Sequence, residues 1–247
     1  MLMPAFLMVP INANGVVTDS NIATNAQNAM GAALNVSDIY LYSHGWSTDA
    51  TGAMTLYNRF SIEYLRWLAE YATLPADGTP HSAHGALSVG IHWPSQLTEE
   101  GGNVPPEFAK LLGAVQPLTF YTMEKRADTT GTHGVYAVLR QLITNWAPHG
   151  AATEQQQILR VNVIGHSFGC KVVTSAIEAL YEDLHSGKLE TAADLRFNVV
   201  LIQAAFENKQ LDPKACYGDV ESLNLRMLVT TSQKDTALTQ AFPLAHK

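Results

Sequence analysis

The sequence contains few cysteines and few basic residues. Cys170 and Cys216 are the only two cysteines among 247 residues, too few for a disulfide framework. Cys170 falls where a buried helix is expected to begin, so we expect a reduced thiol that packs as a small apolar side chain. The 15 Lys and Arg residues are outnumbered by 22 Asp and Glu, and the formal net charge is -7. Without a basic cluster, this charge argues against nucleic acid or an anionic membrane surface as a partner.

Long hydrophobic runs are also missing. No segment approaches the roughly 18 consecutive apolar residues of a transmembrane helix. The apolar start of the chain, Met1–Ile11, has no Lys or Arg before it and no small-residue cleavage site after it. It therefore predicts a first strand, Ala5–Val9, rather than a signal peptide. Together with the scarcity of cysteine, this favours a cytoplasmic protein, and the sequence leaves the oligomeric state open.

The overall composition, 47% hydrophobic and 15% charged, is typical of a globular protein. A chain of this length can form one large α/β domain that buries roughly three quarters of its unfolded surface. No internal repeat, low-complexity tract or linker divides it. We therefore expect a single domain over residues 1–247.

Short apolar runs alternate along the chain with longer helical patterns, which predicts a doubly wound, mostly parallel sheet with helices on both faces. The expected strands are Ala5–Val9, Ile39–Tyr42, Leu87–Trp93, Ile158–Ile164, Phe197–Ile202 and Leu225–Thr230. The expected helices are Asn21–Leu34, Met54–Leu68, Val135–Trp146 and Lys171–Leu184. Residues 95–127 contain paired glycines and paired prolines, and we expect them to form a long excursion that lines a pocket or acts as a lid.

One segment indicates chemistry: Gly165-His166-Ser167-Phe168-Gly169. A Gly-x-Ser-x-Gly match is weak by itself, because a serine in a glycine-rich turn can simply cap the following helix. Here a run rich in β-branched residues precedes the motif and a helical pattern follows it, which is the context the motif requires. Small neighbours would let the strand and helix approach, and the helix start would direct N–H groups toward a developing oxyanion.

With its flanks, Val163–Gly169 resembles the nucleophile elbow of the α/β-hydrolase family. The alternation of strands and helices is similar to that family over nearly the whole chain. The resemblance implies an esterase, lipase or related acyl-transfer enzyme, with Ser167 as nucleophile and with an acid and a histidine following in that order. It implies no metal and no organic cofactor.

The family's oxyanion hole consists of two backbone donors. Phe168, directly after the nucleophile, would supply one N–H. The turn Ser43-His44-Gly45-Trp46 follows an earlier strand and resembles the His-Gly turn of these hydrolases, which nominates the Trp46 N–H as the second donor. The alternative is an ordinary turn glycine beside a surface histidine.

The acid of the family follows a late strand. Asp235 comes shortly after Leu225–Thr230 and is the first candidate, and Glu207 after Phe197–Ile202 is the alternative. His246 is the only histidine after Asp235, so the family order makes it the candidate base. Residues 237–245 contain no convincing strand, so the fold is expected to lack the last strand of the family.

We therefore expect a serine hydrolase that cleaves a small-molecule carboxylic ester through an acyl-enzyme on Ser167. The alternative is a non-catalytic protein of the same fold, with an incomplete triad, that binds a small apolar ligand or a partner. The sequence does not identify the ester.

Overall fold

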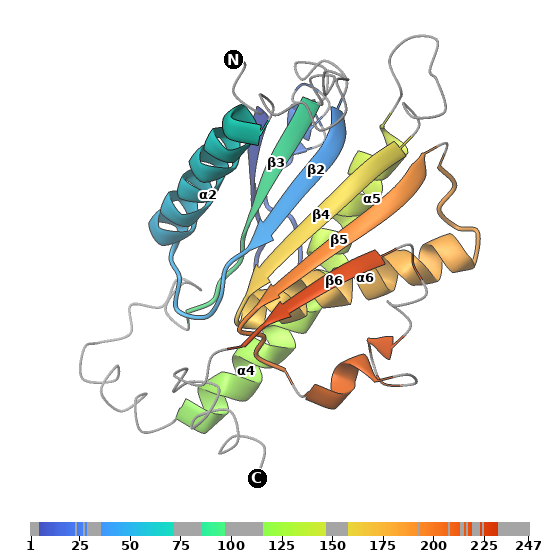
Figure 1. Ribbon diagram of the computed structural model, residues 1–247. Coiled ribbons are helices and arrows are strands. Elements are labelled where there is room, and N and C mark those ends of the chain that lie inside the picture. The colour runs from blue at the N-terminus through green and yellow to red at the C-terminus, as the bar shows by residue number, and fades with distance from the viewer. Residues whose placement is uncertain are drawn as a thin grey trace.

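The computed structural model describes residues 5–22, 24–26, 28, 36–71, 85–96, 116–146, 158–191, 193–206, 208–212, 215, 217–218, 223 and 225–231. These residues form an α/β fold with a six-stranded, entirely parallel sheet (Figure 1). The strands are β1 (Ala5–Pro10), β2 (Val36–Ser43), β3 (Gly85–His92), β4 (Ile158–His166), β5 (Asp194–Ile202) and β6 (Leu225–Thr230). The helices are α2 (Ala50–Tyr71), α4 (Gln116–Thr129), the π-helical η2 (Thr130–Val135), α5 (Tyr136–Thr144), α6 (Phe168–His185) and the short 3₁₀ helix η4 (Asn208–Leu211). The α/β class predicted from the alternating pattern is confirmed.

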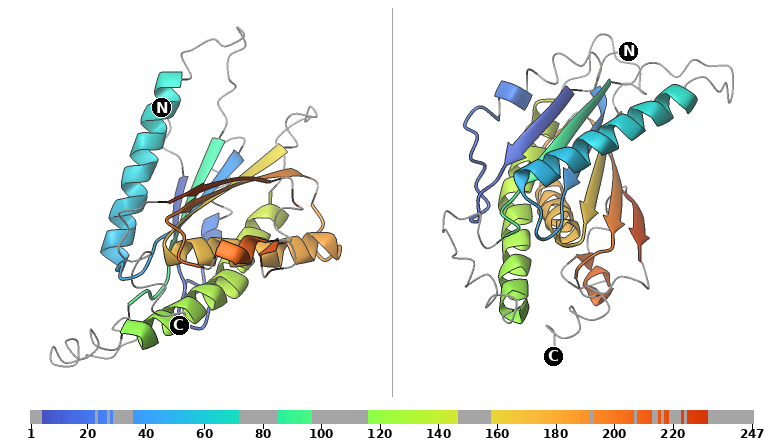
Figure 2. Two further views of the ribbon diagram at one scale, coloured as in Figure 1. Left: turned by 60° about the horizontal axis from the view of Figure 1, so that its bottom comes forward. Right: turned by 90° about the vertical axis from the view of Figure 1, so that its left-hand side faces the viewer.

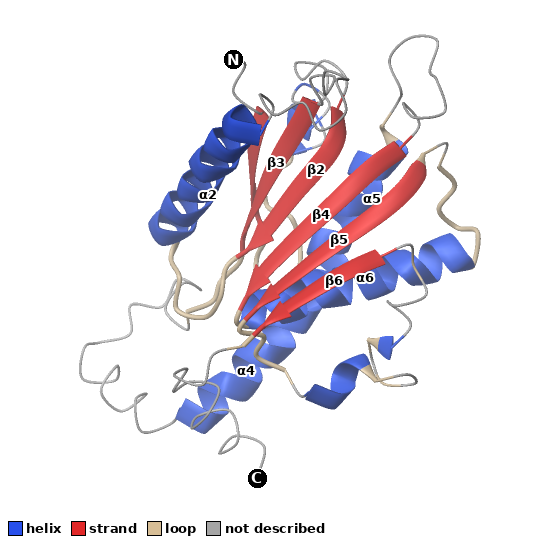
Figure 3. Cartoon of the chain, viewed as in Figure 1, coloured by secondary structure: helices blue, strands red, loops and turns tan. Residues whose placement is uncertain are grey.

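The strand order is β1-β3-β2-β4-β5-β6, so the direction of winding reverses between β2 and β4. After β2 the chain forms β3 on one side, and then β4 on the other side of β2. Because all strands are parallel, their carboxyl ends lie along one edge of the sheet (Figure 3). Ligands of open α/β sheets bind outside these ends, at the point of reversal. A ligand site is therefore expected among the residues that follow β2 and β4.

Helices pack on both faces of the sheet around β2 (Figure 2). On one face, Leu41 and Val163 are fully buried in a core shared with α6, which in turn packs against α4, η2 and α5. On the other face, Tyr42 packs with Ala53 and Tyr57 of α2. The central strands are thus buried between two helical layers.

The outer strands differ from the prediction of two covered faces. β5 and β6 place Arg196, Arg226 and Leu228 on one face, and Leu228 is 58% exposed. Among the described helices, α2 is the one on this side, and it lies over the β2 and β3 half of the sheet (Figure 1). The prediction of helices on both faces therefore holds for the centre of the sheet and not for this outer face, within the described residues.

Helix α2 confirms the predicted helix Met54–Leu68. Its apolar residues Met54, Leu56 and Phe60 are 37%, 47% and 38% exposed. The helix contacts the sheet through the buried Ala53 and Tyr57, and the Phe60 ring also packs on Tyr42 of β2, with centroids 4.6 Å apart. A small residue at position 53 allows close approach, and the tyrosine one turn later reaches buried polar groups. Within the described residues, no helix has both the length and the apolar character needed to cross a membrane.

The predicted excursion over residues 95–127 is described only at its two ends. Its last part belongs to α4, where Met123 and Ala127 are fully buried. This helix continues through η2 into α5, so the helix predicted to start at Val135 belongs to a much longer helical segment. Gly131 explains the close packing of η2 on α6, since a β-carbon there would lie 2.3 Å from the Val172 carbonyl oxygen. Through Met123 and Ala127, this part of the segment contributes to the core.

Candidate active site

Ser167 connects β4 to α6 in a strained backbone conformation. Its φ is 54° and its ψ is -123°, a region that residues with a β-carbon rarely adopt. The Ser167 N–H donates to the Ile202 carbonyl at 3.0 Å, and its own carbonyl accepts from the Cys170 N–H at 3.0 Å and the Ala205 N–H at 3.3 Å. Two of these partners lie at the end of β5 or just after it, so the neighbouring strand holds the serine in this conformation.

The two glycines of the motif allow this connection by steric means. A β-carbon at Gly165 would lie 2.6 Å from the Cys170 backbone nitrogen, and one at Gly169 would lie 2.2 Å from the Ser43 carbonyl oxygen. Real β-carbons do not approach other atoms so closely. Glycine at both positions lets α6 begin directly against the ends of β4 and β2.

The Ser167 hydroxyl does not cap the helix that follows. Ser167 occupies the position immediately before α6, yet its side chain makes no capping hydrogen bond to the first turn. Serine favours this position in other proteins because its oxygen accepts such a bond. The alternative in which Ser167 only caps the following helix therefore leaves its strained conformation without an explanation.

Two other strained residues lie at the same edge of the sheet. Within the described part of the chain, the non-glycine residues with positive φ are Ser47 at 60°, Ser167 at 54° and Gln203 at 51°. They follow β2, β4 and β5, three neighbouring strands of the sheet. Strained backbone positions concentrate at functional sites in proteins. The carboxyl edge around the point of reversal is thus the strained region of the described structure.

The proposed oxyanion residues lie together. Trp46, in the loop after β2, and Phe168, the first residue of α6, make an edge-to-face ring contact with centroids 6.3 Å apart at 73°. Gly45, directly before Trp46, lies against the His166 backbone and against the side chains of His166 and Ser167. The start of an α-helix carries a partial positive charge, which favours an anion beside Phe168.

His44 is buried, contrary to the surface histidine considered above. The Trp93 N–H donates to its Nε2 at 3.3 Å, so Nδ1 carries the proton and donates to the Gly45 carbonyl at 2.9 Å. The imidazole also stacks on the Trp93 ring, with centroids 5.5 Å apart and an interplanar angle of 5°. Burial, together with smaller contributions from the nearby His92 and His166, lowers the pKa of His44 to about 4. The ring is therefore neutral, with both nitrogens occupied by backbone groups.

Tyr57 of α2 completes the support of this loop. Its hydroxyl accepts the His44 N–H at 2.8 Å and donates to the Ile91 carbonyl at 2.6 Å. Burial raises the pKa of Tyr57, so the hydroxyl keeps its proton. The Trp93 indole N–H donates to the His44 carbonyl at 3.1 Å. We call His44, Tyr57 and Trp93 the aromatic clamp, because they fix the loop after β2 to the end of β3.

The clamp residues were not identified as a unit from the sequence. Trp93, the last residue of the predicted strand Leu87–Trp93, follows β3 in the structure and lies in the core at 0% exposure. Ser95 adds a second connection, because its hydroxyl accepts the Thr48 N–H at 3.0 Å and donates to the Thr48 carbonyl at 2.9 Å. The signal available in the sequence was that His44 and Trp93 each follow a strand directly.

The candidate acids Asp235 and Glu207 and the candidate base His246 lie outside the described residues. The described chain does show where the segment leading to Asp235 starts. β6 ends at Thr230, whose carbonyl accepts the Gln203 N–H at 3.0 Å. The chain thus leaves β6 at the edge of the sheet that carries Ser167. His166, next to Ser167, is exposed.

Comparison of the chain with protein-family models, with curated proteins and with solved structures gave no match.

Proposed function

We propose that this chain is a serine hydrolase of the α/β-hydrolase type that cleaves carboxylic esters through an acyl-enzyme on Ser167. The observation that carries the proposal is the conformation of Ser167, a non-glycine residue held at positive φ with a hydroxyl that does not cap α6. A nucleophile elbow has this strained strand-to-helix turn because it presents the serine oxygen above the sheet.

The position of Ser167 in the fold supports the same proposal. It follows β4, and Gly45 and Trp46 follow β2, so they flank the point where the winding of the sheet reverses. This is where open α/β sheets bind their ligands. The aromatic clamp holds the loop after β2 without using the Trp46 amide, which donates to no acceptor within the described residues.

In the proposed reaction, Ser167 Oγ attacks the ester carbonyl carbon while its proton passes to the His246 imidazole. The N–H groups of Trp46 and Phe168 stabilise the negative oxygen of the tetrahedral intermediate. The intermediate collapses, and the leaving alcohol takes the proton from the imidazolium. Water then attacks the acyl-enzyme in the same manner, which releases the carboxylic acid and restores Ser167. Asp235 orients the imidazole and stabilises its charged form.

The test uses a p-nitrophenyl ester and a fluorophosphonate probe with wild type, Ser167→Ala and Ser186→Ala. Ser186 is an exposed serine at the other end of α6 and serves as the matched control. We expect a burst of p-nitrophenol and probe labelling that maps to Ser167 by peptide mass spectrometry. Ser167→Ala should abolish both, and Ser186→Ala should change neither.

A wild-type protein that is folded by circular dichroism but inert toward both reagents would contradict the proposal. Small apolar ligands that then bind equally well to wild type and Ser167→Ala would identify a non-catalytic binding protein instead. The substrate class in the proposal is a small-molecule ester, and the proposed location is the cytoplasm.

A further inference from the structure

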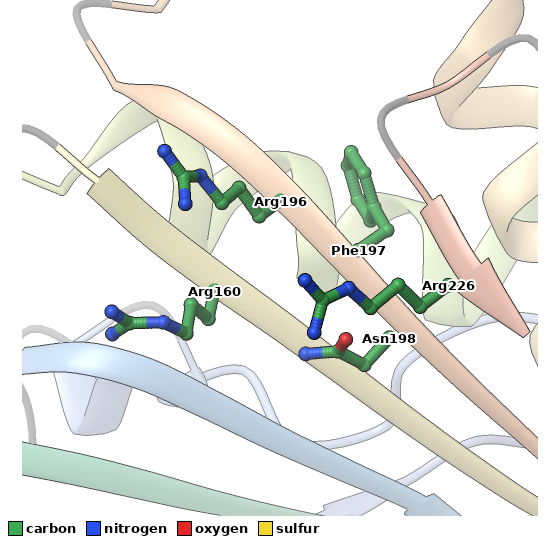
Figure 4. A pocket seen from close by; sticks show the side chains of 5 residues that line it. All are labelled: Arg160, Arg196, Phe197, Asn198 and Arg226. Carbon is green, nitrogen blue, oxygen red and sulfur yellow. The ribbon is translucent and has the colours of Figure 1, made fainter.

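A small pocket lies near the amino ends of β4, β5 and β6. It has a volume of about 150 Å³ and is lined by Arg160, Arg196, Phe197, Asn198 and Arg226 (Figure 4). At a strand rise of about 3.3 Å per residue, Arg160 lies on the order of 20 Å from Ser167 along β4. The pocket is therefore separate from the proposed active site, and its function does not depend on ester hydrolysis.

The strand register gathers three arginines on one face of the sheet. Arg160 of β4 lies directly opposite Arg196 of β5, and Arg226 of β6 lies opposite Asn198. Figure 4 shows the three guanidinium groups extending in the same direction from three neighbouring strands. Like charges directly opposite each other destabilise a sheet, so this arrangement has a cost that a bound anion would offset. The face is the one that α2 leaves uncovered.

Neighbouring carboxylates neutralise only part of this charge. Asp38 accepts one hydrogen bond from Arg160 at 3.3 Å, and Asp194 accepts two from Arg196 at 3.3 and 3.1 Å. Arg226 is exposed and has no ion pair among the described residues. Each guanidinium offers five N–H donors, so most donors of the cluster remain available to a ligand.

We propose that this pocket binds a phosphate group. The planar fork of arginine matches phosphate and carboxylate oxygens, but one fork already satisfies a carboxylate. Three guanidinium groups on three strands, of which Arg226 has no ion pair among the described residues and the other two keep donors that their carboxylates do not use, suit a group with more oxygens and more charge. The pocket is smaller than the roughly 300 Å³ at which sites for drug-sized ligands begin, so it accommodates one such group rather than a large molecule. The chain carries a net charge of -7, which disfavours a general affinity for anions. Phosphate binding would therefore depend on this local cluster of arginines.

The test measures binding of inorganic phosphate to the full chain by calorimetry, at constant ionic strength set with chloride. Wild type is compared with Arg226→Gln and Arg196→Gln, and with Arg66→Gln as control. Arg66 is an exposed arginine of α2, 70% exposed, that pairs with Glu63. We expect saturable binding that each pocket variant weakens at least tenfold and that the control retains. Circular dichroism establishes that the variants are folded.

Two further ligands distinguish the kinds of anion that the pocket could bind. Glycerol 3-phosphate that binds more tightly than phosphate identifies a phosphomonoester site, and equal affinity identifies a site for free phosphate. Succinate that binds as tightly as phosphate would overturn the assignment. So would the absence of saturable phosphate binding, or equal affinity in wild type and both pocket variants. Ester hydrolysis by Arg226→Gln, measured separately, should equal that of wild type.

Discussion

Gly45 lies so close to Ser167 that a β-carbon on the glycine would be 2.8 Å from Cβ of the serine. The loop after β2 and the turn after β4 are therefore in direct contact, although more than a hundred residues separate them in the sequence. A side chain at residue 45 cannot fit unless one of the two segments moves. The position of the serine oxygen and the position of the Trp46 amide are thus linked.

This contact predicts the effect of Gly45→Ala. The added methyl group should displace the Ser167 side chain or the loop, and misplacement of a reacting group by about 1 Å costs on the order of 10²-fold in rate. We expect kcat/KM for a p-nitrophenyl ester to fall at least tenfold in a folded protein. Gly52→Ala in exposed α2, where a β-carbon would meet only side chains at 3.1 and 3.4 Å, should leave kcat/KM unchanged. Equal rates for the two variants would show that the contact does not position the serine.

The strain at Ser167 predicts that a glycine there stabilises the fold. A non-glycine residue in such a region costs about 1–3 kcal/mol, and glycine adopts positive φ readily. Ser167→Gly should therefore raise the free energy of unfolding by about 1 kcal/mol and remove the proposed esterase activity. Ser167→Ala keeps the β-carbon and should remove activity without this gain. Urea denaturation of the three proteins measures the difference, and identical stabilities of the glycine and alanine variants would argue against strain.

The choice between the two candidate acids can be made with isosteric amides. If Asp235 orients the base, Asp235→Asn should reduce kcat by roughly 10³ to 10⁴, as loss of the acid does in other triads. Glu207→Gln should then change kcat less than threefold. The opposite ranking would transfer the role to Glu207. His246→Asn should be at least as inactive as the variant of the correct acid.

The buried imidazole of His44 predicts an acid-dependent loss of stability. The pKa of His44 is about 4 in the folded protein and near 6.5 when the ring is exposed, so the unfolded chain binds more protons between these values. Above pH 6.5 both forms are neutral and the group has no effect. As the pH falls to 4, protonation of the unfolded state should cost about 3 kcal/mol of stability.

Ring titration by NMR checks the His44 prediction directly. The Nδ1-protonated tautomer should persist at pH 5 in the folded protein. In His44→Asn, the decrease in unfolding free energy between pH 6.5 and 4 should be smaller than in wild type. A native His44 that titrates near 6.5 would contradict the assigned clamp.

Cys170 should be chemically inert in the folded protein. The thiol is fully buried at the start of α6, and burial raises its pKa to about 12. Thiolate is the reactive form, so little of it exists at pH 8. In a Cys216→Ser background, we expect no reaction with Ellman's reagent until denaturant is added. Rapid reaction in the native state would mean that the start of α6 opens readily.

The predicted strands and the turn at Ser167 agree well with the structure because they depend on local signals. Ile158–Ile164 is rich in β-branched residues and ends at a glycine that the packing of α6 requires, so strand, turn and helix are encoded together. The residues through which α2 packs on the sheet could not be predicted. Leu56 is 47% exposed, whereas the small Ala53 is fully buried against the sheet.

The roles of His44 and Tyr57 could not be predicted, since they depend on which strands become neighbours. A histidine has a polar side chain, so its position after a strand does not by itself predict burial. His44 is buried because Trp93 and Tyr57 supply its hydrogen-bond and stacking partners. The arginine pocket has the same origin. Arg160, Arg196 and Arg226 are unremarkable in sequence, and only the register of β4, β5 and β6 brings them together.

The reversal of winding between β2 and β4 also determines when the site can exist during folding. The pairing of these strands joins Asp38 to Arg160 across 122 positions of sequence. Contacts of such separation form late and slowly, because the intervening chain must first lose its freedom. The segments around Gly45 and Ser167 meet only when this pairing is complete. We therefore expect recovery of the proposed esterase activity to follow the slowest phase of refolding, well after most helix has formed.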